Sequence, residues 1–146
     1  MARVYETAAS KTSAASASQI LSITTGTRRA SILELGIFVT TAVAGEVGLG
    51  RATGTGATPT STLVQAMDTA DEAGTSNLTS YATGVTAPSV FMRRIQLPAT
   101  IGAGVIWTWA PGEFTIPASI TTTTAPVIWQ ISTAAVGYDV YVKVLE

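Results

Sequence analysis

Short runs of alternating apolar and polar residues recur along most of this chain, and glycine, proline, serine or threonine bounds each run. Alternation with a period of two places successive side chains on opposite faces of a β-strand. The clearest run is Gly137–Leu145, in which Tyr138, Val140, Val142 and Val144 share one face. We therefore expect a half-buried strand in this segment.

The same pattern predicts about eight to ten short strands after residue 18. In the long run Arg28–Val43, the side chains of Leu33, Leu35 and Ile37 would share a face, and Gly36 marks a bulge or a close contact on the other. The other predicted strands are Gln19–Thr25, Glu46–Ala52, Leu78–Val85, Val90–Leu97, Val105–Trp109, Phe114–Ile116 and Pro126–Ser132.

Two segments between these runs lack clear alternation. Thr53–Pro59 reads as a loop, and Leu63–Met67 is either a short strand or a single helical turn. Because so many short strands follow one another without long helices, we expect two stacked antiparallel sheets. The fold class predicted is therefore an all-β antiparallel sandwich, and a jelly roll fits best among such folds.

The N-terminal residues 1–18 differ from the rest. The stretch Thr7–Ser18 has no large apolar side chain, so it buries too little area to offset its own ordering entropy. It is either a frayed terminus or an extended arm that orders against a neighbouring subunit. We expect a low-complexity arm over residues 1–18 and a single sandwich domain over residues 19–146.

Composition supports the β prediction. The chain has 25 Thr, 13 Val and 11 Ile but only 8 Leu. Branching at Cβ stiffens the side chain and suits a pleated surface better than a helix. At 146 residues the chain has the size of one domain.

Histidine and cysteine are both absent. Histidine is the usual general base near neutral pH, and both residue types are common metal ligands. No serine has a histidine to activate it, so the usual serine-hydrolase arrangements are missing. We expect no catalytic, cofactor-binding or metal-binding residues, no small-molecule substrate, and a function carried by a surface.

Charge argues against two classes of partner. A net charge of −1 provides no basic face for nucleic acid. The most apolar window, Ile32–Val47, is interrupted by Glu34 and Glu46 and is too short to span a membrane. No secretory run follows Arg3, so we expect synthesis in a cytoplasm.

Two motifs contain residue types that occur in ligand sites. The glycine-rich stretch Gly48–Gly56 lacks the lysine and the following helix of a phosphate loop, so we expect a hairpin corner with a loop. The carboxylates of Asp68, Asp71 and Glu72 do not have the spacing of a calcium loop. We expect them to be solvated loop charges.

Arginine pairs and tryptophans form the remaining candidates. In each of the pairs Arg28-Arg29 and Arg93-Arg94, one arginine would point toward the packed side of its strand. This arginine would either pair with a carboxylate, of Glu34, Asp139 or another subunit, or extend its charged end to solvent at the end of the strand. The last candidates are Trp107, Trp109 and Trp129. Their alternation with aliphatic residues favours a core position over a sugar-stacking platform.

Three segments carry a resemblance to a known class: Arg29–Phe38, Leu97–Trp107 and Gly137–Val142. In a Thr-, Ala- and Gly-rich β chain without histidine or cysteine, they resemble capsid decoration (cement) and related structural proteins of tailed bacteriophages. The resemblance implies a jelly-roll module of the virion, commonly a homotrimer, that binds the major capsid protein where shell subunits meet. A tail, neck or fibre component and a carbohydrate-binding jelly roll are the alternatives.

Overall fold

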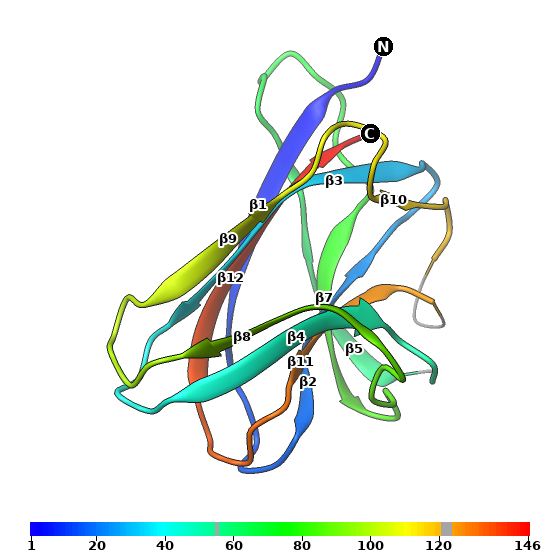
Figure 1. Cartoon of the computed structure of the whole chain (residues 1–146). Helices are drawn as coiled ribbons and strands as arrows, with labels where there is room; N and C mark the ends of the chain where they lie inside the picture. The colour runs from blue at the N-terminus through cyan, green and yellow to red at the C-terminus, as the bar shows by residue number, and fades with distance from the viewer. Residues whose placement is uncertain (55, 121–123) are drawn as a thin grey trace.

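The structure, a computed structural model, describes residues 1–54, 56–120 and 124–146. Within these residues all regular elements are β-strands (Figure 1). The strands are β1 (Val4–Thr12), β2 (Ser18–Thr24), β3 (Ala30–Val39), β4 (Gly45–Arg51), β5 (Ala57–Leu63), β6 (Gln65–Ala66), β7 (Asn77–Thr83), β8 (Phe91–Leu97), β9 (Gly104–Thr108), β10 (Thr115–Ile116), β11 (Pro126–Gln130) and β12 (Gly137–Leu145).

These strands pair antiparallel to form two six-stranded sheets. Sheet A has the order β10-β3-β12-β1-β6, with β9 also paired to β3, and sheet B has the order β5-β7-β2-β11-β4-β8. The predicted all-β antiparallel sandwich is confirmed. The more specific expectation of a jelly roll is not confirmed. Among the described residues, no helix is long and apolar enough to cross a membrane.

One hydrophobic core joins the inner faces of the two sheets. Sheet A contributes Val140 and Val142 from β12, and sheet B contributes Ile23 and Leu49 from β2 and β4; all four are almost fully buried. The period-two pattern of Gly137–Leu145 therefore predicts its buried face correctly. Burial of these side chains supplies most of the stabilisation available to a sandwich.

Two local predictions about facing were wrong because the strands contain register shifts. The register of β3 against β12 moves by one residue at Leu33, so Ile32 points into the core in its place. The register of β8 against β4 shifts between Leu49 and Gly50. The alternation in Val90–Leu97 predicts that Phe91, Ile95 and Leu97 share one face. Phe91 instead packs on the outer face of sheet B, opposite to the face of Ile95.

The expected N-terminal arm is not confirmed. The residues Val4–Thr12 form β1, which pairs with β12 over nine successive residues, from Val4 opposite Leu145 to Thr12 opposite Gly137. Tyr5 is completely buried. The prediction failed because backbone pairing with a long central strand orders a segment of small side chains that has no apolar pattern of its own.

Sheet B has an edge strand that the sequence did not indicate. Every residue of β5 is exposed, so no apolar alternation marks it. This strand includes Pro59, which was expected in a loop; Thr55, in the same predicted loop, lies outside the described residues. Of the two alternatives for Leu63–Met67, the strand is correct, since β5 ends at Leu63 and β6 follows it.

A buried glutamine holds two loops together at one end of the sandwich. The Gln130 side-chain nitrogen donates hydrogen bonds to the carbonyl oxygens of Ala134 at 2.6 Å and Ser132 at 3.0 Å. Its oxygen accepts bonds from Ser13 at 2.5 Å and from Tyr138 at 3.1 Å. Because a buried polar group is costly when unpaired, this network fixes the β1–β2 and β11–β12 corners against each other.

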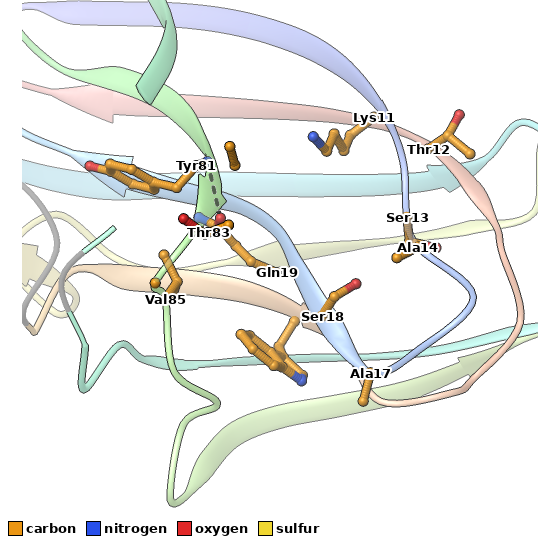
Figure 2. A pocket seen from close by; sticks show the side chains of 13 residues that line it. Lys11, Thr12, Ser13, Ala14, Ala17, Ser18, Gln19, Tyr81, Thr83 and Val85 are labelled. Carbon is orange, nitrogen blue, oxygen red and sulfur yellow. Dashed lines mark hydrogen bonds between the residues drawn. The ribbon is translucent and has the colours of Figure 1, made fainter. Parts of the chain in front are cut away.

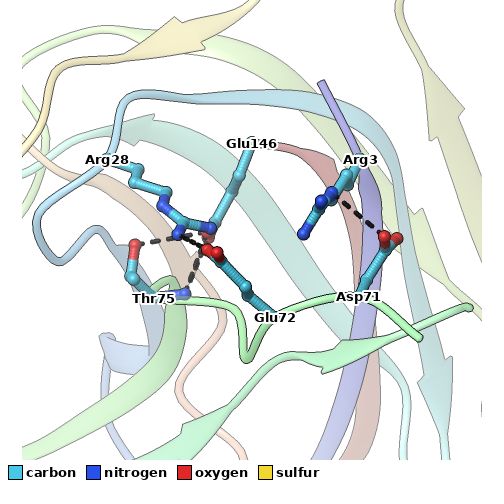
Figure 3. A network of polar contacts seen from close by, with 6 residues as sticks. All are labelled: Arg3, Arg28, Asp71, Glu72, Thr75 and Glu146. Atoms are coloured by element: carbon cyan, nitrogen blue, oxygen red, sulfur yellow. Dashed lines mark hydrogen bonds and ion pairs between the residues drawn. The ribbon is translucent and has the colours of Figure 1, made fainter. Parts of the chain in front are cut away.

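The two ends of the chain are joined at the opposite end. Backbone hydrogen bonds connect Arg3 and Glu146 in both directions, at 2.8 and 3.0 Å. The Glu146 carboxylate also accepts a bond from the backbone N–H of Thr75 at 2.9 Å (Figure 3). A second bond comes from the backbone N–H of Ser76 at 2.6 Å. The side chain of Glu146, which directly follows β12, therefore anchors the segment that leads into β7.

Candidate functional site

The outer face of sheet A is the most distinctive surface of the molecule. We call it the open face; across β1, β12, β3 and β9 it comprises Glu6, Ala8, Ser10, Lys143, Tyr141, Asp139, Glu34, Gly36, Phe38, Thr108, Ile106 and Gly104. The strand registers arrange these residues in rows. In the middle row Ala8 lies opposite Tyr141, Tyr141 opposite Gly36, and Gly36 opposite Ile106.

Two aromatic rings lie flat on the open face because glycines make room for them. A Cβ on Gly36 would fall 2.0 Å from Cε1 of Tyr141, and one on Gly104 would fall 2.4 Å from Cδ1 of Phe38. The two rings are stacked, with centroids 6.3 Å apart and an interplanar angle of 14°. The close contact predicted as one alternative for Gly36 is therefore present, and it produces a flat aromatic surface.

The position of Tyr141 is fixed by a polar contact. Its hydroxyl donates a hydrogen bond to the carboxylate of Glu34. Desolvation, together with this hydrogen bond and the carboxylate charge, raises the pKa of Tyr141 to about 12. The phenol therefore keeps its proton to a higher pH than an ordinary tyrosine does.

A shallow hollow of about 320 Å³ lies beside the rings. Its lining includes Ala8, Ser10, Phe38, Asp139 and Tyr141. Asp139 accepts a hydrogen bond from Ser10 across the β1–β12 pair. The open face thus combines a flat apolar centre with a few hydrogen-bonding groups, which is the composition of many protein interfaces.

The outer face of sheet B uses the same device but is covered. The ring of Phe91 lies over Gly48, and Pro88 lies over Gly50. A second small core forms there from Ala52, Val127 and Trp129, with Val85, Phe91 and Ile131 packed against it. We call this the covered face, because the segment that includes Val85 and Pro88 packs on it.

The tryptophans do not form an exposed platform. Trp107 and Trp129 are only 7% and 8% exposed. Trp109 is half-buried, with the Arg93 guanidinium 5.1 Å above its ring and Phe114 5.0 Å away. The core interpretation is therefore correct for Trp107 and Trp129, and Trp109 closes one side of the sandwich beneath an arginine.

The arginine pairs find partners other than those predicted. Arg94 pairs with Glu46 at 2.5 Å on the outer face of sheet B, and Arg28 pairs with Glu72. The suggested acceptors Glu34 and Asp139 accept bonds from Tyr141 and Ser10. The prediction that neighbouring arginines point to opposite faces is confirmed for Arg93 and Arg94.

The acidic stretch is largely taken up in ion pairs. Asp71 lies 3.0 Å from Nε of Arg3, and Glu72 pairs with Arg28, whose hydrogen bond and charge lower the pKa of the Glu72 carboxyl (Figure 3). The expectation of purely solvated charges therefore holds less well for these two than for Asp68. In the part of the chain that the structure describes, no group of three His, Cys, Asp or Glu could hold a metal ion.

A deeper cleft opens in sheet B between β2 and β7 (Figure 2). Its volume is about 530 Å³, and its lining includes Lys11, Ser18, Gln19, Thr83 and Trp129. No pattern in the sequence predicts this cleft, because its walls are mostly alanine, serine and threonine. It lies beside the β1–β2 corner that Gln130 holds in place.

Comparisons with known proteins identify no relative. No family model matches the chain, and neither a curated protein nor a solved structure matches it.

Proposed function

We propose that this protein is a structural assembly module of a virus particle, and that it serves as a capsid decoration protein on the outer shell. The observation that carries the proposal is the open face. It presents Tyr141, Phe38 and Ile106 on a flat sheet, and Ile106 is 51% exposed. The class of particle follows from the resemblance to tailed-phage decoration proteins.

The two outer faces of the sandwich support a binding role for the open face. On sheet B, the chain's own residues bury Trp129, which is 8% exposed, and Phe91 packs partly buried against the same small core. On sheet A, a comparable aromatic surface carries no such layer among the described residues. Apolar area left exposed in this way favours association with another protein surface.

Charge on the open face is confined to its margins. Glu6, Lys143 and Glu34 occupy one row, and Asp139 lies in the row on the other side of Tyr141. The centre can therefore be desolvated at low cost, while the marginal charges orient a partner. We propose that the partners are the major capsid protein and further copies of this chain, as a homotrimer on the virion.

Light scattering and shell binding test the proposal together. The native mass of the wild-type protein would be measured over a range of concentrations, followed by cosedimentation with assembled shells of the major capsid protein. We expect a trimer and saturable binding to shells. A double variant, Tyr141→Ala with Ile106→Thr, should lose binding by at least about tenfold while keeping its fold.

A matched control keeps the test specific. The variant Thr60→Ala changes an exposed residue of edge strand β5, distant in the strand order from the open face, and should bind as wild type does. A ring or filament in light scattering would favour a tail, neck or fibre component. A strict monomer that does not bind shells would contradict the proposal.

A further inference from the structure

The cleft in sheet B is a split between two neighbouring strands. β2 and β7 pair only over Ser22–Thr24 and Asn77–Thr79. Continuing this register would place Ile20 opposite Tyr81 and Ser18 opposite Thr83. The two strands instead diverge, and the cleft of about 530 Å³ lies between them (Figure 2).

A bulge in β2 accounts for the divergence. The register between β2 and β11 shifts at Ile20, because Ile128 pairs with Leu21 but Trp129 pairs with Gln19. An extra residue of this kind bends the strand that carries it. The first part of β2 therefore follows β11 and leaves β7.

The Gln19 side chain already occupies the narrow end of the split. Its oxygen accepts a hydrogen bond from the Tyr81 backbone N–H at 3.2 Å, and its nitrogen lies 3.4 Å from the Thr79 carbonyl oxygen. The Tyr81 N–H and the Thr79 carbonyl are backbone groups with which residues of an adjacent strand would otherwise pair. Beyond Gln19 no described strand continues the sheet on this side.

The wall beyond Gln19 presents backbone groups and small side chains. Because the Tyr81 N–H points toward β2, the N–H of Thr83, two residues further along, points the same way. The Ser18 hydroxyl is buried and has no hydrogen-bond partner among the residues that the structure describes. Ala17 and Ala82 line the same space, so a polypeptide backbone can approach both walls.

Charge in the cleft is one-sided. Lys11 contributes the one charged side chain of the lining, and within the described residues it forms no ion pair. A carboxylate on the occupant would complement it. The edge of sheet B that β5 forms is less suited to pairing with an added strand, because Pro59 of β5 lacks a backbone N–H.

We propose that the cleft accepts an extended segment of the major capsid protein, which pairs with β7 as an added strand and places a carboxylate near Lys11. This inference rests on the proposed shell-binding function and adds a second contact to it. Strand addition supplies affinity through main-chain hydrogen bonds, and the narrow cleft selects small side chains. Such a segment would tie the module to one shell subunit.

Peptides provide the test. Fluorescent peptides of about ten residues, which span a typical strand, would be tiled over the major capsid protein and titrated against the full chain. We expect an acidic segment to bind and to perturb the backbone amide resonances of Ser18–Leu21 and Ser80–Thr83. Thr83→Pro removes the N–H that faces the cleft and should weaken binding about tenfold, whereas Thr83→Val keeps it and should not.

Each outcome decides one claim. Lys11→Met should weaken the same peptide several-fold and reduce the salt dependence of its binding. If no tiled peptide perturbs these amides, or if a soluble oligosaccharide perturbs them instead, the inference is wrong. Equal shell binding by wild type and a folded Thr83→Pro variant would leave the shell function standing without it. Binding of a tiled peptide without binding of shells would support the strand-addition site and contradict the proposed shell-binding function.

Discussion

The outer faces of the two sheets both place an aromatic ring over a glycine, but among the described residues a segment of the chain packs on only one of these faces. On the covered face, Phe91 lies over Gly48 and packs, partly buried, against the second core that contains Trp129. On the open face, Tyr141 lies over Gly36, and Ile106 in the same row is half exposed. Glycine under an aromatic ring is therefore a general device of this chain for making a flat surface.

The difference teaches where stability and binding reside. A ring that is covered by its own chain contributes to folding, since its burial is complete when the protein folds. A ring that stays at the surface contributes its remaining burial only when a partner arrives. Substitutions on the two faces should therefore separate stability from assembly.

The largest effect is expected for Trp129→Ala on the covered face. Trp129 is 8% exposed and belongs to the second core. Removing the indole leaves a cavity and should lower the free energy of unfolding by about 3–5 kcal/mol. Urea denaturation measures this loss.

Tyr141→Ala is the matched change on the open face. It should cost about 1 kcal/mol, because the ring is only partly buried and loses one hydrogen bond. The comparison between faces would fail if Tyr141→Ala destabilised the protein as much as Trp129→Ala. It would be sharpened if only Tyr141→Ala abolished shell binding.

Glycine substitutions give the next effect. In Gly48→Ala the new Cβ would lie 2.5 Å from Cδ1 of Phe91, a ring whose displacement would disturb its packing against the second core. We expect a loss of about 1–3 kcal/mol. Gly36→Ala should cost less, since the Tyr141 ring can swing toward solvent. Thermal unfolding of the two variants side by side checks the order.

How much of this could be read from the sequence depends on whether a strand buries one face. β12 was predicted with its correct facing because four alternating side chains enter the core. β5 was missed because it is exposed along its whole length, and β1 because its register comes from β12. Alternation of apolar residues reflects the burial of one face, so it does not predict a strand whose position is set by pairing with its neighbours.

The candidate surfaces were harder to predict than the fold. Gly36 was noted as a close contact, but the partner ring, Tyr141, lies 105 positions further along and meets it only through the β3–β12 register. The β2–β7 cleft depends on a bulge at Ile20, and a bulge is set by tertiary context. Neither feature has a local motif.

Alkaline pH compares two tyrosines that lie in different environments, one in the core and one on the open face. The pKa of Tyr138, in the core, and that of Tyr141, on the open face, are both raised to about 12, chiefly by desolvation. An unfolded tyrosine ionises near pH 10, so the folded state retains these protons longer. The stabilisation is complete below about pH 10 and is lost as the pH rises toward 12.

We expect the wild-type protein to lose free energy of unfolding from Tyr141 across this interval, by less than the full pKa shift implies because solvent screens the partly exposed phenol. Tyr141→Phe removes that part of the pH dependence and leaves the part due to Tyr138. Urea denaturation at several alkaline pH values measures the slopes. An unchanged slope in Tyr141→Phe would show that the open face does not hold its phenol as the contact with Glu34 implies.

The smallest effect on stability is expected at the margin of the open face. Nζ of Lys143 lies 3.8 Å from a carboxylate oxygen of Glu6, and both side chains are about one-third exposed. Such a pair is screened by solvent and salt, so Lys143→Met should change the free energy of unfolding by less than about 0.5 kcal/mol. Because the same charge borders the proposed interface, the variant should nonetheless alter the salt dependence of shell binding, measured by cosedimentation at several ionic strengths. A large loss of stability with unchanged binding would reverse the roles assigned to the two faces, since it would place folding energy on the open surface.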